Sequence, residues 1–390
     1  MFERRFLPVV VIFLVSALVL VLGLWAVDSS DQSRPLPAAS NSSDVPEYRW
    51  KLVTTWPKNL PGLGAAPEKF AQYVNEMSGG RLEVRVFGAG EIVPAFEVFD
   101  AVSQGAAEVG HGASYYWKGK IPAAVFFTAV PFGMTAQEMN GWLHYGGGLE
   151  LWEELYAPFG VIPFAGGSTG VQMAGWFNRE LRSAKDLSGL KMRIPGLAGE
   201  VFDAAGGTAV RIAGGEVYTS MQTGVIDAVE WVGPYNDRTL GLNEVAEYYY
   251  YPGWHEPGAM LEFTVNSAAF NQLPSDLQAI VRYAARAANQ NMLDEFTARN
   301  NESLQQLLAA GTKLRPLPDD ILSLLYEKSL EAMATLRASD TMAEKIAVSY
   351  DIFSKNVRAY HEISERAYLN ARDKVLPPVM SGVFQAEPGR

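Results

Sequence analysis

Alternating strand-like and helix-like segments constrain the fold of this chain more than any other feature of its sequence. Residues 48–55 favour a strand, residues 70–77 carry apolar side chains at helical spacing, and two glycines then end the helix. Residues 82–86 alternate apolar and charged side chains, and residues 96–104 return to helical spacing. This order of strand, helix, strand and helix predicts an α/β protein, in which helices cover the faces of a sheet.

The last third of the chain is predicted to be helical. Residues 275–310 keep helical spacing throughout, and Ser275 lies three residues before Gln278, a pattern typical of a capping box. A helix of about 35 residues spans about 50 Å, which is enough to bridge two lobes. Two further helices are predicted over residues 319–337 and 341–373.

The amino terminus predicts export. Arg4 and Arg5 precede an almost wholly apolar segment, residues 6–27, so this end enters a membrane with its basic residues left in the cytoplasm. Residues 1–27 are therefore expected to be a signal peptide or an N-terminal membrane anchor, and the sequence leaves both open. Residues 28–46 are rich in Ser, Asn and Pro and indicate a flexible linker.

The folded part of the chain is long enough for two lobes. The predicted parts are lobe I over residues 47–168 with 263–286, lobe II over residues 169–262 with 287–340, a C-terminal helix over residues 341–373, and a tail over residues 374–390. Cysteine is absent, which excludes disulfides and cysteine metal ligands. The net charge of −11 argues against nucleic acid as a partner.

A repeated pattern predicts two aromatic walls of a cleft. Residues 102–112 and residues 221–233 each combine a helix end, a glycine, an acid and a short apolar strand. Two unrelated strand-and-helix units would also look like this. Ligands of open α/β sheets bind beyond the carboxyl ends of strands, so the loops that follow would face each other. Their aromatic residues are Tyr115, Tyr116 and Trp117 on one wall, with Trp231 and Tyr235 on the other.

Residues 166–237 concentrate polar groups that suit the binding of a small carboxylate. The candidates are Gln172, Arg193, Glu230, Trp231, Tyr235 and Asn236. An arginine offers a planar fork of donors that matches a carboxylate, and aromatic side chains supply the walls of such sites. The residues alone leave two alternatives open, a structural ion pair for Arg193 and a solvated position for Glu230.

The sequence contains no recognised catalytic motif. The histidines, His111, His144, His255 and His361, are scattered without the spacing of metal ligands. The glycine-rich phosphate loop and the nucleophile elbow are also missing from the sequence. Two alternative functions stay open. One is an exported or membrane-tethered enzyme that acts on small organic acids, and the other is the binding protein of an ATP-driven transporter.

Three motifs carry a family resemblance. The segments KMRIPG at residues 191–196, QTGVIDAVEWVGPYND at 222–237 and LPSDLQ at 273–278 resemble the solute-binding component of tripartite ATP-independent periplasmic (TRAP) transporters. The resemblance implies a two-lobe periplasmic binding protein fold and small and large membrane subunits as partners. Gln172 and the Glu-Trp pair of the second motif resemble the branch that binds a 2-oxoacid or hydroxyacid, such as pyruvate or lactate, with a metal ion. The tryptophan replaces an asparagine that is common in the sialic acid and dicarboxylate branch, which puts those ligands in doubt.

The resemblance also implies a set of ligand-binding residues. The substrate would contact Arg193, Gln172, Trp231, Tyr115, Tyr116 and Asn236, and the cation would contact Gln172, Glu230, Trp231 and Glu256. A closed site with Arg193, Glu230 and a monocarboxylate retains one negative charge, which a monovalent cation would neutralise. If Glu256 also reaches the site, the balance moves toward a divalent ion. Because the ligands are oxygen atoms, Na⁺ or Ca²⁺ is expected.

The predicted C-terminal helix carries a long apolar stripe. Its members, at spacings of three or four, are Ile346, Tyr350, Phe353, Val357, Tyr360, Ile363 and Ala367. Some members of the metal-dependent branch pair through a C-terminal helix, so the resemblance implies a homodimer. The alternative is that the stripe packs on its own chain.

Overall fold

The computed structural model describes residue 18 and residues 47–376. The chain divides into two units, residues 1–45 and residues 46–390, and the fold described below belongs to the second unit. The predicted leader or anchor, the linker and most of the tail lie outside the described residues. Within the described part, no helix is both long and apolar enough to cross a membrane.

The first sheet has five strands, in the order β2-β1-β3-β10-β4. Their bounds are Tyr48–Thr54 (β1), Leu82–Phe87 (β2), Val109–Gly112 (β3), Val161–Ser168 (β4) and Met260–Asn266 (β10). β1 runs parallel to β2 and β3, whereas β10 pairs antiparallel with β3 and β4. The predicted alternation of β2 is confirmed, because its apolar side chains are buried and its charged ones are exposed.

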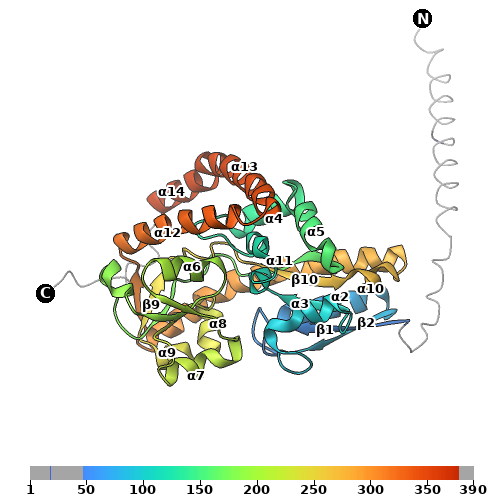
Figure 1. Ribbon diagram of the computed structural model, residues 1–390, viewed down its shortest axis with the longest axis horizontal. Coiled ribbons are helices and arrows are strands. Elements are labelled where there is room, and N and C mark those ends of the chain that lie inside the picture. Colours follow the sequence, from blue (N-terminus) through green and yellow to red (C-terminus); the bar gives the residue numbers. More distant parts are fainter. Residues whose placement is uncertain (1–17, 19–46, 377–390) are drawn as a thin grey trace, which may run out of the picture. The chain divides into compact units, whose positions relative to one another are not determined.

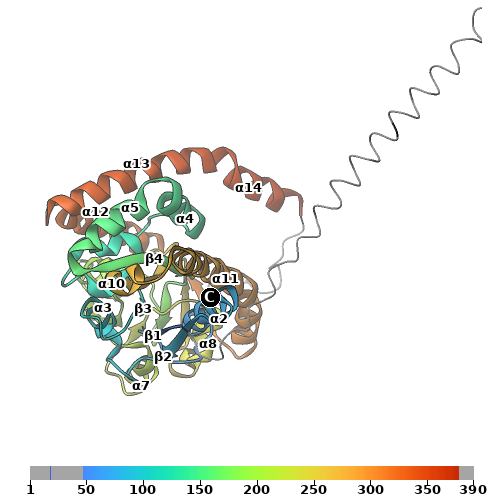
Figure 2. The ribbon, with the colours of Figure 1, turned by 90° about the vertical axis from the view of Figure 1, so that its right-hand side faces the viewer.

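Two helices supply much of the core of this sheet. α2 (Ala65–Ser78) packs on β2 and on the long helix α11 (Ser275–Ala309), as Figure 2 shows. Phe70 of α2 is fully buried and stacks on Phe263 of β10 at 4.3 Å between ring centroids. Gly79 ends α2 as predicted, since its φ of 62° is a left-handed conformation that glycine adopts without strain. α3 (Val98–Ser103) precedes β3.

The second sheet has six strands, in the order β11-β9-β5-β8-β6-β7. Their bounds are Gly175–Phe177 (β5), Lys191–Arg193 (β6), Thr208–Val210 (β7), Ala228–Val229 (β8), Tyr248–Tyr251 (β9) and Lys313–Pro316 (β11). β6 is parallel to β7 and β8, and β5 is antiparallel to β8 and β9. In Figure 1, α6 (Gly196–Ala204) and α12 (Asp319–Arg337) lie above this sheet, with α7 (Val217–Gln222), α8 (Pro234–Thr239) and α9 (Leu242–Val245) below.

The predicted long helix is confirmed as α11. It contacts β4 and α2, which belong to the first sheet and its helices, and α8, which lies beside the second sheet. The predicted capping box at its start is wrong. Pro274 occupies the N-cap position in an extended conformation, so Ser275 is already the first helical residue. The side-chain amide of Gln278 instead donates to the carbonyl oxygen of Leu273 at 2.9 Å.

The C-terminal region is helical, as predicted, but its last helix is broken. α13 (Thr341–Ile363) and α14 (Glu365–Val375) meet at Ser364, whose φ of −106° and ψ of −99° are not helical. The Ser364 hydroxyl donates to the Tyr360 carbonyl oxygen at 2.9 Å, and such bonds back to the preceding turn bend helices. α13 packs on α4 (Ala136–Tyr145) and α5 (Gly148–Tyr156).

The remaining elements are short. They are the α-helix Ser267–Asn271 (α10) and six 3₁₀ helices, Ala95–Glu97 (η1), Ser114–Trp117 (η2), Pro122–Phe127 (η3), Ala157–Phe159 (η4), Ala184–Leu187 (η5) and Gly214–Glu216 (η6). The predicted α/β class with a long helix and a helical C-terminal region is confirmed. The boundaries of the two lobes stay a prediction.

Candidate cation and carboxylate site

A small enclosed cavity brings together most of the residues that the sequence analysis singled out. Its lining comprises Trp56, Leu63, Tyr115, Tyr116, Thr169, Gln172, Arg193, Trp231, Val232, Glu256 and Leu261. These side chains come from the first sheet and the second sheet and from the segments that follow their strands. Every one of them is at least nine-tenths buried. The site is therefore shielded from water, which strengthens electrostatic interactions inside it.

Arg193 is placed by the carboxyl end of β6. The residue is 1% exposed, and its Nη1 donates to the Glu230 carbonyl oxygen at 2.8 Å and to Glu230 Oε2 at 3.0 Å. Nη2 donates to the Tyr116 hydroxyl at 3.3 Å, and the guanidinium lies 4.8 Å from the Trp231 ring centroid. The guanidinium is thus fixed in place while one side of it still lines the cavity.

Glu230 directly follows β8, so its backbone extends the strand that neighbours β6. Its side chain is 1% exposed, which excludes the solvated position that the sequence left open. Its two oxygen atoms have different neighbours. Oε2 pairs with Arg193, whereas Oε1 lies 3.4 Å from Nε2 of His255, another buried side chain.

Glu256 and Gln172 form the second polar group of the site. Gln172 Nε2 donates to Glu256 Oε2 at 2.8 Å and to the Thr169 hydroxyl at 3.1 Å, which leaves its carbonyl oxygen, Oε1, without a partner among the described residues. Burial, and then the nearby charge of Glu230, holds the pKa of the Glu256 carboxyl well above its usual range. The loop that carries Glu256 is hydrogen-bonded to the segment that follows β4 of the first sheet. Thr169 N donates to the Ala259 carbonyl oxygen at 3.2 Å.

Aromatic side chains close the cavity. Tyr115 and Tyr116 belong to η2, which follows β3, and burial raises the pKa of the Tyr116 hydroxyl to about 12, so this group remains a neutral donor. Trp231 follows Glu230 and meets Trp56 edge-on at 6.2 Å between ring centroids. Tyr115 and Tyr116 of one predicted wall and Trp231 of the other therefore line the same cavity.

Three of the predicted wall or ligand residues point elsewhere. Trp117 donates from its indole nitrogen to the buried carboxylate of Glu262, and the Tyr235 hydroxyl donates to Glu295 on α11 at 3.0 Å. Asn236 is not among the described residues that line the cavity. It accepts from the indole nitrogen of Trp231 at 2.7 Å. Asn236 is therefore in a position to orient Trp231.

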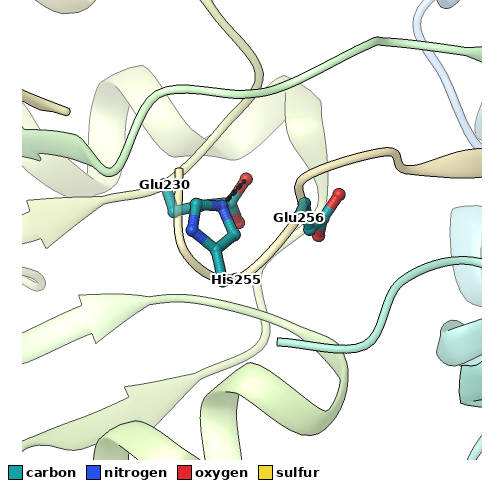
Figure 3. Close-up of side chains that lie close together, drawn as sticks. All are labelled: Glu230, His255 and Glu256. Atoms are coloured by element: carbon teal, nitrogen blue, oxygen red, sulfur yellow. Dashed lines mark ion pairs between the residues drawn. The ribbon is translucent and has the colours of Figure 1, made fainter. Parts of the chain in front are cut away.

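The donor set fits a cation. Glu230, His255 and Glu256 each offer a ligand atom, and these atoms all lie within 4.8 Å of one another (Figure 3). The unpartnered Oε1 of Gln172 adds a neutral oxygen beside Glu256. A buried oxygen with no donor is costly, and a bound cation would satisfy it.

Sequence reasoning missed two contributors. Trp56 follows the first strand, and its indole nitrogen donates to Nδ1 of His111 at 3.1 Å. The other ring nitrogen of His111, Nε2, donates to the Gly166 carbonyl oxygen at 3.0 Å. Burial lowers the pKa of His111 to about 4, so this histidine is a neutral support. The second is His255, adjacent to Glu256. The only sequence signal for Trp56 was an aromatic residue just after a strand end.

Residues 52–339 match the family described as bacterial extracellular solute-binding protein, family 7, also called DctP. This match covers well over half of the chain. The chain belongs to this family.

The family 7 protein has relatives of known structure or name. It is 44% identical over 332 residues, covering 85% of this chain and 91% of the relative, to a monocarboxylate 2-oxoacid-binding periplasmic protein of Nostoc sp.. A TRAP periplasmic solute-binding protein from Pseudoalteromonas atlantica with bound sodium and pyruvate shares 43% identity, with a TM-score of 0.81 over 83% of this chain and 99% of that one.

A third relative is a TRAP transporter solute-binding protein from Bordetella bronchiseptica. It shares 35% identity and a TM-score of 0.83, over 85% of this chain and 98% of that one. Its crystal structure is a dimer of mixed occupancy, with copurified calcium and picolinate in one active site and the other site apo. These similarities confirm the predicted TRAP solute-binding protein fold.

Proposed function

We propose that this family 7 protein captures a small monocarboxylate together with one metal cation outside the cytoplasm and delivers it to TRAP membrane subunits. The ligand class is a 2-oxoacid such as pyruvate or a hydroxyacid such as lactate. The observation that carries this proposal is the buried Arg193, already paired with Glu230, beside a Gln172 oxygen that has no partner among residues 47–376. The Arg193 guanidinium can bind an anion, and the Gln172 oxygen can bind a cation.

The ligand would be held at its carboxylate by Arg193. Arg193 lines the cavity, with Nε on the Ile212 carbonyl oxygen at 3.3 Å and Nη2 on the Tyr116 hydroxyl at 3.3 Å. A carboxylate there would accept charge-assisted hydrogen bonds, each worth about 1.5 to 3 kcal/mol. Apolar side chains of Leu63, Val232 and Leu261 line the same cavity and suit a short hydrocarbon tail.

The cation would be held by Gln172 Oε1 and Glu256, with Glu230 and the backbone of Trp231 nearby. These hard oxygen ligands suit Na⁺ or Ca²⁺. If Glu256 is ionised, a divalent ion and Arg193 together neutralise both glutamates and the bound carboxylate. If Glu256 keeps its proton, which its raised pKa favours, a monovalent ion is sufficient.

The relatives support this assignment. The Nostoc protein is named for binding monocarboxylate 2-oxoacids, and the Pseudoalteromonas protein holds sodium and pyruvate. Both cover more than four-fifths of this chain. We therefore place this protein in the periplasm and favour a TRAP transporter over an ATP-driven one.

Mass spectrometry of material purified without refolding tests the proposal. Native spectra should show one small organic acid and one Na⁺ or Ca²⁺ per chain, both lost on dialysis against chelator at low pH. An enzyme would instead convert pyruvate or lactate during incubation. Turnover of either acid, or a copurified sugar acid or dicarboxylate, would contradict the proposed role.

We also propose that the protein forms a homodimer through the C-terminal helices. The predicted apolar stripe is divided: Tyr350 is buried on its own chain, where its hydroxyl accepts from Met134 N at 2.9 Å, and Phe353 packs near α4. Beyond these residues, Ile363 is 78% exposed and Tyr368 is 66% exposed, and every side chain of α14 faces solvent. A second copy would cover this apolar surface.

A further inference from the structure

His255 is a buried side chain of the site to which the proposed capture of a carboxylate gives no role. Its side chain is 0% exposed, and neither ring nitrogen has a hydrogen-bond partner among residues 47–376. Such a group is costly to bury unless something binds to it. The ring of His255 points toward the carboxylate of Glu230, as Figure 3 shows.

The spacing around His255 matches the edge of a tetrahedral metal site. Nε2 of His255 lies 3.4 Å from Oε1 of Glu230, and one ligand atom from each of Glu230, His255 and Glu256 lies within 4.8 Å of the other two. Ligand atoms about 2.1 Å from a tetrahedral ion are themselves about 3.4 Å apart. The His255–Glu230 pair already has this separation, and Glu256 is the nearby third acid.

Arg193 does not occupy the position that the ion would take. The guanidinium contacts Oε2 and the backbone carbonyl oxygen of Glu230, whereas the other carboxylate oxygen, Oε1, faces His255. Glu230 can therefore keep its ion pair and still offer one oxygen to a metal. With both glutamates ionised and a monocarboxylate bound, Arg193 and a divalent ion leave the cavity neutral.

We propose that His255, Glu230 and Glu256 form a site for a divalent ion of the Zn²⁺ or Co²⁺ class, with His255 as its nitrogen ligand. This inference rests on the proposed function, because Glu256 would serve either ion. Imidazole nitrogen suits Zn²⁺ and Co²⁺, whereas Na⁺ and Ca²⁺ prefer oxygen ligands alone. His255 is thus the residue that decides whether the cavity accepts a transition metal in place of Na⁺ or Ca²⁺.

The test compares metal binding by the full chain and by His255→Gln, after removal of metal with chelator. The amide of glutamine keeps a polar side chain of similar reach but removes the nitrogen ligand. Calorimetry should show one Zn²⁺ site in the wild type and a loss of affinity of about 10- to 100-fold in the variant. Ca²⁺ affinity, measured in parallel, should fall by a smaller factor than Zn²⁺ affinity, because calcium prefers oxygen ligands.

His144→Gln is the matched control, since His144 is a partly buried histidine that does not line this cavity. This variant should bind Zn²⁺ as the wild type does. Equal Zn²⁺ affinity in His255→Gln and wild type, or a loss only in His144→Gln, would overturn the proposal. X-ray absorption of the wild-type Zn²⁺ complex needs no variant, and a spectrum without imidazole scattering would also overturn it. If pyruvate fails to bind with any cation, the proposed function fails, whereas the Zn²⁺ result still judges His255.

Discussion

Arg193 and Glu230 are both nearly inaccessible to solvent, and they form a buried ion pair at the wall of the cavity. Removing one member of a buried ion pair typically costs about 3 to 5 kcal/mol of stability, because the other charge is left unpaired. A test of ligand binding at this pair must therefore keep the charge and change only the geometry.

Arg193→Lys keeps the positive charge but loses the planar fork of donors. We expect pyruvate affinity to fall at least tenfold, or about 1.4 kcal/mol, in calorimetric titrations with Ca²⁺ present. Arg315→Lys on β11 is the control and should bind as the wild type does, since Arg315 is exposed and does not line the cavity. Unchanged affinity in Arg193→Lys, with the fold intact by circular dichroism, would remove Arg193 from the ligand site.

Glu262 is a buried acid outside the cavity lining, and we expect it to contribute to the pH dependence of stability. Its carboxylate accepts from the Trp117 indole and from the Tyr156 hydroxyl, and burial raises its pKa to about 8. The folded state therefore holds a proton that the unfolded state releases above its usual pKa of about 4.5. Between these two values stability falls as pH rises, by an amount on the order of a few kcal/mol.

Thermal unfolding at several pH values checks this expectation. The Tm of the wild type should drop between pH 6 and pH 9 by more than that of Glu262→Gln, because the amide stays neutral throughout. Glu91→Gln, an exposed control, should follow the wild type. Parallel Tm curves for Glu262→Gln and wild type would show that Glu262 is ionised in the fold.

At the scale of single residues, the sequence identified Arg193, Gln172, Glu230, Trp231, Tyr115, Tyr116 and Glu256, and the structure brings these side chains together. Most are recognisable because they sit in motifs beside strand ends. Trp56 and His255 were not recognised as site residues, since a residue after a strand or beside an acid has no distinctive local pattern. The roles of all these residues stay predictions.

At the scale of elements, local periodicity predicted the bounds of β2, α11 and α12 closely, and the end of α2 but not its start at Ala65. The break between α13 and α14 was not predictable, because the apolar spacing continues across Ser364 while only its backbone angles leave the helical region. The bend separates α13, part of which packs on α4 and α5, from α14, whose apolar side chains remain exposed.

The exposed helix α14 gives a prediction about the oligomeric state. Light scattering at tens of micromolar should find a dimer, and Ile363→Glu with Tyr368→Glu should convert it to a monomer with unchanged circular dichroism, because both charges would have to be buried. Thr219→Glu, an exposed change on α7, should remain dimeric; Figure 1 places α7 on the opposite side of the fold from α14. A monomeric wild type would contradict the proposed homodimer.

At the scale of the whole molecule, the sequence predicted an α/β fold with a long bridging helix but not the pairing of its strands. β10 joins the first sheet between β3 and β4, although about 150 residues separate it from β3 along the chain. Such long-range pairing depends on tertiary packing and leaves no periodic signal. The cavity takes its lining from both sheets, at the end of β6 and in the segments that follow β3 and β8.

The central claim is that a cation and a small carboxylate bind together. Calorimetric titration of metal-free protein with pyruvate tests it most directly, in choline buffer with chelator and then with Na⁺ or Ca²⁺ added. We expect affinity to rise at least tenfold with one of these ions, since each ligand compensates the charge of the other. Glu256→Gln should lose most of that gain. Equal pyruvate affinity with and without the cations would contradict the account.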